Sequence, residues 1–451
     1  MPYESKNECN KFSKTDSEIL NKTFYEETSK CENSKEHRTN FQQINNNFNF
    51  IINLNENTSN YQNVFKTDEI KINSYYNYSS NNYQDNNESS NTGCQLDNNE
   101  HEQKNGTDQT KLNYLINMCK SQVGCRKLQN KLYSNRDYAN SYLYPLLKCR
   151  MLELINDHIG NYLYQQFLDV LNKENLRDLI KYIFCNFNSI AFSPNGTRIV
   201  QKLIDNISQT NNDLFIFVYE LLHSQLKNNI AFISTDENAN HIVQKFLICI
   251  KSPYTNFIYD EIINNFVQIS TTKYGCCVVQ KCLLHGNQEQ REKIIICILN
   301  NTYKLIVDQF GNYVYQSLIN TNEDRIIYEI YRIISPNFIL LCKQKYSSNV
   351  IEKLFDINNK NLVYKIAKLV YNNEKDIIEL LTDQYGNYII QKIMDCLENK
   401  VIIQTILYFI ISNVHFICQT SFGKSLLNKL SKKHILIANV LSQKKISIPD
   451  Y

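Results

Sequence analysis

A five-residue motif recurs eight times along the chain, and in most copies apolar residues lie between a polar residue at the start and a polar residue at the end. The copies are CRKLQ (125–129), NYLYQ (161–165), TRIVQ (197–201), NHIVQ (240–244), CCVVQ (276–280), NYVYQ (312–316), SNVIE (348–352) and NYIIQ (387–391). Of the seven intervals between their starts, five are 36 residues long and the others are 43 and 39. This period indicates a solenoid, whose units are each too small to bury their own apolar face.

Written on a helix at 100° per residue, segment 240–247 separates into two faces. The apolar face holds Ile242, Val243, Phe246 and Leu247, and the polar face holds Asn240, His241 and Gln244. Six of the eight motifs directly follow a glycine, which permits a tight turn, and in three of them an aromatic residue precedes the glycine. A further apolar run precedes that turn. Each repeat is therefore expected to contain two or three helices, and the fold class is all-α, with the polar trios on one face.

The first quarter of the chain differs from the rest in composition. Residues 1–110 contain 24 asparagines and keep no apolar period, so we expect a disordered, low-complexity N-terminal region. They carry 10 basic and 17 acidic residues, whereas residues 111–451 carry 38 basic and 28 acidic residues. The basic excess of the second part suggests an anionic partner for the solenoid.

The 15 cysteines form no C-x-x-C pair and no Cys/His group with the spacing of a structural zinc site. Free thiols in a reducing compartment are expected, with no metal, no cofactor and a cytoplasmic location. The first residues lack the apolar stretch of a signal peptide. Segment 401–418 approaches the length of a membrane span, but polar residues interrupt it and it keeps the register of the repeats, so we interpret it as a buried helix.

The first, second and fifth residues of each motif form a trio on the polar face. The first position holds Cys125, Asn161, Thr197, Asn240, Cys276, Asn312, Ser348 and Asn387. The fifth position holds Gln129, Gln165, Gln201, Gln244, Gln280, Gln316, Glu352 and Gln391. The second position holds Arg126, Tyr162, Arg198, His241, Cys277, Tyr313, Asn349 and Tyr388. The first and fifth residues can together bond the edge of a planar ligand, and flat second residues can stack on its face, as proteins hold unpaired bases.

This pattern resembles the Pumilio or PUF family of RNA-binding proteins over residues 112–435, including the family's single Ser-Asn-x-x-Glu repeat in seventh place. The resemblance implies a right-handed, crescent-shaped α-solenoid of eight repeats, which we place at 111–435 and expect to be a monomer. Segment 421–430 resembles the C-terminal capping half-repeat, although Lys424 and Asn428 do not fit the base-reading pair. Residues 436–451 would be a tail, and no N-terminal cap is visible before Lys111.

In the family, the first and fifth residues contact the base edge and the second stacks on the base. Asn with Gln reads uracil, bonding O4 through Asn and N3–H and O2 through Gln. Cys or Ser with Gln reads adenine, and Ser with Glu reads guanine, whose N1–H and N2 amino group both donate to a carboxylate. Thr197 departs from the adenine pattern by a methyl group, and Cys277 is a weak stacker. Because the family binds RNA antiparallel to the protein, the resemblance implies the element 5′-UGUAUAUA-3′.

The resemblance further implies binding in mRNA 3′ untranslated regions, with repressor or deadenylase proteins recruited by the convex face, and hence translational repression or mRNA decay. The longest interval, around residues 208–213, is a candidate partner loop or a tolerated insertion. Two alternatives stay open: a protein-interaction scaffold and a nucleolar ribosome-assembly relative. An enzyme is not expected, because there is no phosphate-binding loop and the eight histidines have no partner pattern.

Overall fold

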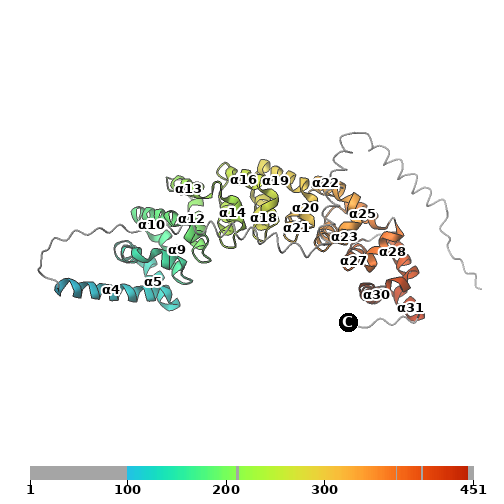
Figure 1. Ribbon diagram of the computed structural model, residues 1–451, viewed down its shortest axis with the longest axis horizontal. Helices are drawn as coiled ribbons and strands as arrows, with labels where there is room; N and C mark the ends of the chain where they lie inside the picture. The colour runs from blue at the N-terminus through green and yellow to red at the C-terminus, as the bar shows by residue number, and fades with distance from the viewer. Residues whose placement is uncertain (1–98, 210–212, 372, 398–399, 445–451) are drawn as a thin grey trace, which may run out of the picture. The chain divides into compact units, whose positions relative to one another are not determined.

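The computed structural model describes residues 99–209, 213–371, 373–397 and 400–444, all of which belong to one compact unit of the chain. These residues form helices joined by short turns, without a strand among them, and the helices follow one another in chain order from α4 to α31 (Figure 1). Residues 1–98 of the region expected to be disordered and residues 210–212 of the candidate loop between the third and fourth repeats lie outside the described residues.

The second to eighth repeats each consist of a short helix, a motif-bearing helix and a long helix, whereas the first repeat shares only the motif-bearing helix with them. The motif helices are α5 (Gln122–Ser134), α9 (Gly160–Val170), α12 (Thr197–Ser208), α15 (Asn240–Cys249), α18 (Gly275–His285), α21 (Gly311–Ile319), α24 (Ser347–Leu354) and α27 (Gly386–Cys396). The short helices are α8 (Met151–Asn156), α11 (Phe187–Ala191), α14 (Ile230–Thr235), α17 (Phe266–Ser270), α20 (Thr302–Ile306), α23 (Phe338–Cys342), α26 (Glu374–Thr382) and α29 (Val414–Ile417). The long helices are α10 (Lys173–Cys185), α13 (Asp213–Leu226), α16 (Asn256–Asn264), α19 (Gln288–Asn300), α22 (Asp324–Ile334), α25 (Lys360–Tyr371) and α28 (Lys400–Ser412).

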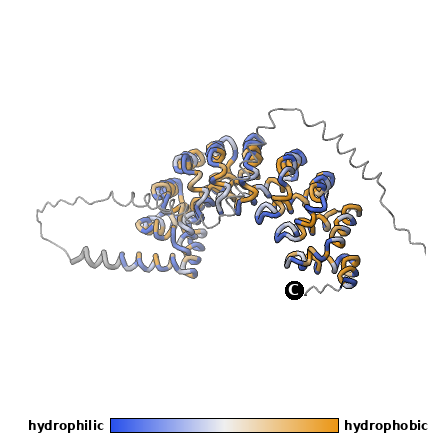
Figure 2. Tube along the Cα trace, turned by 45° about the vertical axis from the view of Figure 1, so that its right-hand side comes forward, coloured by the Kyte–Doolittle hydropathy of each residue, from blue (hydrophilic) through white to orange (hydrophobic). Residues whose placement is uncertain are grey.

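The motif helices form one continuous row, because each packs on the next from α5 to α27. The apolar face predicted for segment 240–247 is confirmed: Ile242, Val243 and Phe246 are fully buried and Leu247 is 1% exposed. Figure 2 shows hydrophobic and hydrophilic positions mixed along each helix of the solenoid. The core therefore runs as a ribbon between stacked helices, and each repeat is stabilised by its neighbours.

The glycine before most motifs is needed for close packing rather than for an unusual backbone conformation. None of the described glycines has a positive φ. A Cβ on Gly275 would lie 2.2 Å from the carbonyl oxygen of Ile269 in the preceding short helix. The glycine thus lets the motif helix start directly against the short helix, which fixes where the trio lies.

Both ends of the helical array extend beyond the expected borders. Helix α4 (Asn99–Lys120) begins ahead of position 111 and packs on α5, α8 and α9, so it covers the first repeat as an N-terminal cap. Between α5 and α8 the chain forms α6 (Arg136–Tyr138), the π-helical turn η1 (Ala139–Leu143), α7 (Tyr144–Leu147) and the 3-10 turn η2 (Lys148–Arg150). At the other end, α30 (Ser421–Lys433) packs on α27 as the expected half-repeat, and α31 (Ile435–Gln443) occupies part of the expected tail.

Candidate nucleic-acid interface

The eight trios lie in the first turns of the eight motif helices and therefore follow one another along the row. Their second residues are all exposed, as stacking requires. The tyrosines at this position are half-exposed: Tyr162 by 45%, Tyr313 by 53% and Tyr388 by 56%. Arg198 Nη1 donates to the Tyr162 hydroxyl at 3.1 Å, so the flat groups of two successive repeats are held next to each other before any ligand arrives.

The first residue of each trio is buried, which differs from the expectation that the whole trio points outward. Exposure at this position is between 0 and 7% in all eight repeats. In the four repeats that begin with Asn, the side chain turns back onto a carbonyl group of the preceding turn, which also accepts the backbone N–H of the same residue. Only the edge of this side chain is left for a ligand.

The four repeats with Asn in first place share one hydrogen-bond network. Asn240 Nδ2 donates to the carbonyl oxygens of Asp236 at 2.7 Å and Glu237 at 2.9 Å. Gln244 Nε2 donates to Asn240 Oδ1 at 2.6 Å. The same Gln-to-Asn bond measures 2.8 Å in the second repeat and 2.9 Å in the sixth and eighth. Because carbonyl oxygens only accept, the Asn amino group must face inward, and Asn Oδ1 faces the row.

The repeats with a smaller first residue bond differently. Cys276 Sγ contacts the carbonyl oxygen of Lys273 at 3.3 Å, and Thr197 Oγ1 donates to the carbonyl oxygen of Asn238 in the next repeat at 3.3 Å. In the first repeat, Gln129 Nε2 donates to the backbone of Tyr162 at 3.2 Å instead of to its own first residue, Cys125. These repeats therefore place a shorter side chain in the first position, with other hydrogen bonds than those of Asn.

The seventh repeat presents a carboxylate in a cavity of about 300 Å³. The cavity is lined by Tyr313, Gln316, Asn349, Glu352, Lys353 and Asp356. Asp356 pairs with Lys392 at 2.7 Å and with Lys353 at 3.5 Å, whereas the carboxylate of Glu352 has neither a hydrogen bond nor an ion pair within the described part of the chain. The carboxylate of Glu352 is thus an acceptor-only group that is open to a donor from outside.

Two of the predicted site residues, Cys125 and Cys276, have thiols that stay protonated. Burial raises the pKa of the Cys276 thiol to about 12 and also raises the pKa of Cys125, so both act as neutral, small side chains near pH 7.

Within the described ranges no group of three His, Cys, Asp or Glu side chains could hold a metal ion. The helix at 400–412 belongs to the solenoid, and none of the described helices has the length and apolar character to cross a membrane.

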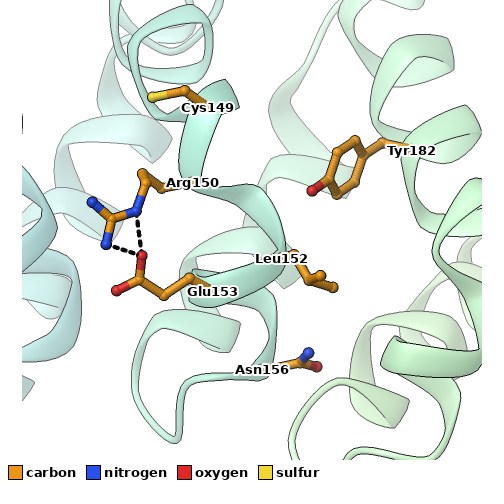
Figure 3. Close-up of a pocket in the computed structure, with 6 residues that line it drawn as sticks. All are labelled: Cys149, Arg150, Leu152, Glu153, Asn156 and Tyr182. Carbon is orange, nitrogen blue, oxygen red and sulfur yellow. Dashed lines mark hydrogen bonds and ion pairs between the residues drawn. The ribbon is translucent and has the colours of Figure 1, made fainter. Parts of the chain in front are cut away.

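A second cavity, of about 430 Å³, contains no trio residue. It lies between α8 and α10 and is lined by Cys149, Arg150, Leu152, Glu153, Asn156 and Tyr182 (Figure 3). Hydrogen bonds from Lys120 and Arg150, with Lys120 contributing most, lower the pKa of Glu153. The charge of this carboxylate is thereby already balanced by Lys120 and Arg150. The ion pair between Lys120 and Glu153 also joins the N-terminal cap to the second repeat.

Comparison with known proteins agrees with this geometry. The model of the Pumilio-family RNA-binding repeat matches the chain seven times, over residues 150–184, 186–216, 229–263, 265–299, 301–334, 337–367 and 376–407. The chain belongs to the Pumilio family. The seven matches contain the second to eighth motifs, and the first motif lies ahead of them. The predicted all-α solenoid and RNA-binding class are confirmed, and the assignment agrees with a binding protein rather than an enzyme.

Similar proteins include the suppressor protein MPT5 of Saccharomyces cerevisiae, 33% identical over 148 residues, or 32% of this chain and 17% of that protein. Pumilio homolog 9 of Arabidopsis thaliana is 29% identical over 29% of this chain and 22% of its own length. The aligned parts thus span about a fifth of these relatives. Among solved structures, the Puf4 RNA-binding domain bound to the HO endonuclease RNA 3′ UTR recognition sequence aligns with a TM-score of 0.62 and 32% identity, over 69% of this chain and 97% of that one. PUF-8 in complex with PBE-RNA gives 0.60 and 27%, over 74% and 97%.

Two groups of residues near the trios were not identified from the sequence. The first is a set of ion pairs between the motif helices of neighbouring repeats: Lys202–Asp169 at 3.2 Å, Lys245–Asp205 at 2.6 Å and Lys392–Asp356 at 2.7 Å. In each, a Lys five residues after a motif start meets an Asp eight residues after the preceding start. The second group is the residue four places before each motif, which caps the turn. Both have fixed offsets that the repeat alignment could have revealed.

Proposed function

We propose that the chain binds single-stranded RNA of the sequence 5′-UGUAUAUA-3′, one base per repeat, with the first base at the eighth repeat. The observation that carries this proposal is the Gln-to-Asn hydrogen bond, which recurs with lengths of 2.6–2.9 Å in four repeats. A nucleic-acid strand fits such a recurring pair, because it offers similar chemical groups at regularly spaced positions.

The hydrogen bonds favour a particular way of reading uracil. Both amino hydrogens of Asn240 are engaged with carbonyl oxygens, so Asn240 meets the ligand through Oδ1 as an acceptor instead of donating to O4. Uracil offers N3–H to that oxygen, and its neighbouring carbonyl groups can accept the free N–H of Gln244. Cytosine has an acceptor at N3, which would oppose Asn240 Oδ1. The network thus supports uracil over the other pyrimidine.

The remaining four repeats select purines in this proposal. Cys125, Thr197 and Cys276 leave space for adenine, with Gln129, Gln201 and Gln280 at its edge. Glu352 accepts from N1–H and the N2 amino group of guanine, while Ser348 keeps that space open. The second residues of the trios stack on the bases, and each stacked base contributes about 1–3 kcal/mol to the free energy of binding. The fifth repeat should stack most weakly, because Cys277 has no flat face.

A binding titration tests this function. A fluorescein-labelled UGUAUAUA oligonucleotide and a variant with UGU changed to ACA are titrated with the full chain, and fluorescence anisotropy is measured. The matched element should bind more tightly by at least about 3 kcal/mol, taking about 1–3 kcal/mol for each mismatched base. Equal affinities would refute sequence-specific RNA binding and would favour the protein-interaction scaffold instead.

We also propose a cellular role: the chain is a cytoplasmic monomer that binds elements in mRNA 3′ untranslated regions. It lowers expression of these mRNAs through repressor or deadenylase partners. The similar Puf4 domain is described as bound to a 3′ UTR recognition sequence, which supports the RNA target. A reporter mRNA with UGUAUAUA elements should be repressed by the chain, and one with ACAAUAUA elements should not. Repression of both reporters would contradict a role that depends on this element.

A further inference from the structure

The eight repeats differ systematically at the residue four places before the motif, which we call the turn residue. It is Asp157, Asp236, Asp308 and Asp383 in the four repeats whose trio begins with Asn. It is Ser121, Ser193 and Thr272 in the repeats that begin with Cys, Thr and Cys, and Gln344 in the repeat that begins with Ser. The type of turn residue thus follows the type of first residue in all eight repeats of one chain.

The Asp and the Ser or Thr side chains cap the turn in different ways. Asp308 Oδ1 accepts two backbone N–H groups, from Phe310 at 2.8 Å and from Gly311 at 2.7 Å. The other three Asp residues do the same, with distances of 2.7–2.9 Å. The Ser and Thr hydroxyls accept only one N–H, at 3.1 Å in each case. An Asp turn is therefore fixed at two successive peptide groups.

The doubly bonded turn holds the carbonyl groups that orient the Asn side chain. Asn312 Nδ2 donates to the carbonyl oxygens of Asp308 at 2.9 Å and Gln309 at 3.0 Å. Sharing the Asp carbonyl with a side chain lengthens its helical bond: the first residue's backbone N lies 3.2–3.4 Å from it in the Asp repeats and 2.8–3.1 Å in the others. The turn residue, the carbonyl groups and the Asn amide form one unit in which only Asn Oδ1 is left facing the row.

From this geometry we infer that the Asp turn residues are specificity-positioning residues, which impose the discrimination of uracil from cytosine by preventing the Asn amide from rotating. A rotated amide would present Nδ2 to the base and would then match the N3 acceptor of cytosine. This inference rests on the proposed function and concerns residues that do not touch the RNA. The Ser and Thr repeats need no such restraint, because a thiol or hydroxyl in first place has no amide to orient.

The test substitutes Asp308 in the sixth repeat, which reads the third base. Asp308→Ser keeps a good helix cap but accepts one N–H, as in the third repeat, and Asp308→Asn keeps an oxygen that can accept both. Affinities for UGUAUAUA and UGCAUAUA are measured by anisotropy for the full chain and each variant. The preference for uracil over cytosine should fall about fivefold or more in Asp308→Ser and should be retained in Asp308→Asn, with melting temperatures close to that of the unsubstituted chain.

A matched control is Thr272→Ala in the fifth repeat, which removes a single-acceptor cap. It should lower the melting temperature without changing the preference for adenine at the fourth base over UGUUUAUA. An unchanged uracil preference in Asp308→Ser would overturn the inference, and so would an equal loss in Asp308→Asn, which would assign the effect to charge. If the unsubstituted chain itself shows no uracil preference at the third base, the proposed function fails first, so the two failures are distinguishable.

Discussion

We expect two substitutions in the seventh repeat, Ser348→Asn and Glu352→Gln, to invert the proposed reading of the second base. Together they convert the acceptor-only pair into the amide pair of the second, fourth, sixth and eighth repeats. The turn is already suited to Asn, because Gln344 Oε1 accepts two N–H groups, from Tyr346 at 2.9 Å and Ser347 at 2.7 Å, as the Asp residues do. The carbonyl oxygen of Lys345, now bonded by Ser348 Oγ at 3.2 Å, would accept the new amide.

The magnitude follows from the hydrogen bonds that are exchanged. Guanine loses the carboxylate that accepts its N1–H and N2 amino group, and uracil gains an acceptor and a donor, each change being worth about 1–3 kcal/mol. The relative affinity for UGUAUAUA and UUUAUAUA should therefore shift toward uracil by more than about tenfold. Removing a negative charge near RNA strengthens binding of both oligonucleotides alike, so the ratio of the two dissociation constants is the quantity to measure.

The assay titrates both oligonucleotides with the unsubstituted chain, the double variant and Asp356→Asn as a charge control. Asp356 lines the same cavity but pairs with Lys392, so its substitution should change both affinities by the same factor. Circular dichroism verifies that each variant is folded. If the folded double variant still prefers guanine, or if Asp356→Asn shifts the ratio equally, Glu352 does not contact the base and the one-repeat-one-base mechanism is refuted.

Three further predictions address other parts of the chain. Bound UGUAUAUA should protect the exposed Cys277 from alkylation by N-ethylmaleimide but leave the exposed Cys149 and Cys185 reactive, which peptide mass spectrometry can measure. Equal protection of all three cysteines would contradict the placement of RNA on the row of motif helices. Burial opposes ionisation of Asp178, but the Lys148 ammonium at 2.8 Å and the Tyr144 hydroxyl at 2.7 Å outweigh burial and lower the pKa of Asp178. The stability that the ionised carboxylate contributes is therefore present above its ordinary pKa near 3.8 and is lost as the pH falls through the lower pKa of the folded state. Asp178→Asn should therefore lower the melting temperature at pH 7 and cease to do so at strongly acidic pH, and a pH-independent difference would refute this. Deleting residues 1–98 should leave the base preferences unchanged, because the acidic, Asn-rich segment lacks the charge to hold RNA, and altered preferences would show that it reads RNA.

The sequence was sufficient for the helices and for the row of trios, because both depend on local periodicity. The apolar set of segment 240–247 is buried where the 100° spacing placed it, and the eight exposed second residues follow from the same spacing. The sequence did not reveal helix α4 over residues 99–110, since this stretch is polar and shows no apolar period. Its helical conformation continues from the more apolar part of α4, where Ile116 and Cys119 are buried against the first repeat.

Periodicity also could not show which way each reading side chain is turned. A helical projection treats Asn240 as an outward residue, yet Asn240 lies in the first turn, where carbonyl groups of the preceding turn compete for its amide. The outcome depends on how the turn is capped, and the capping residue lies outside the motif from which the face was predicted. We therefore expect the base preference of a repeat to depend on the motif together with the turn that precedes it. A code read from the first and fifth residues alone should hold wherever an Asn follows a turn residue that accepts two N–H groups, as in the four Asn repeats of this chain, and should weaken where an Asn follows a turn with a single acceptor.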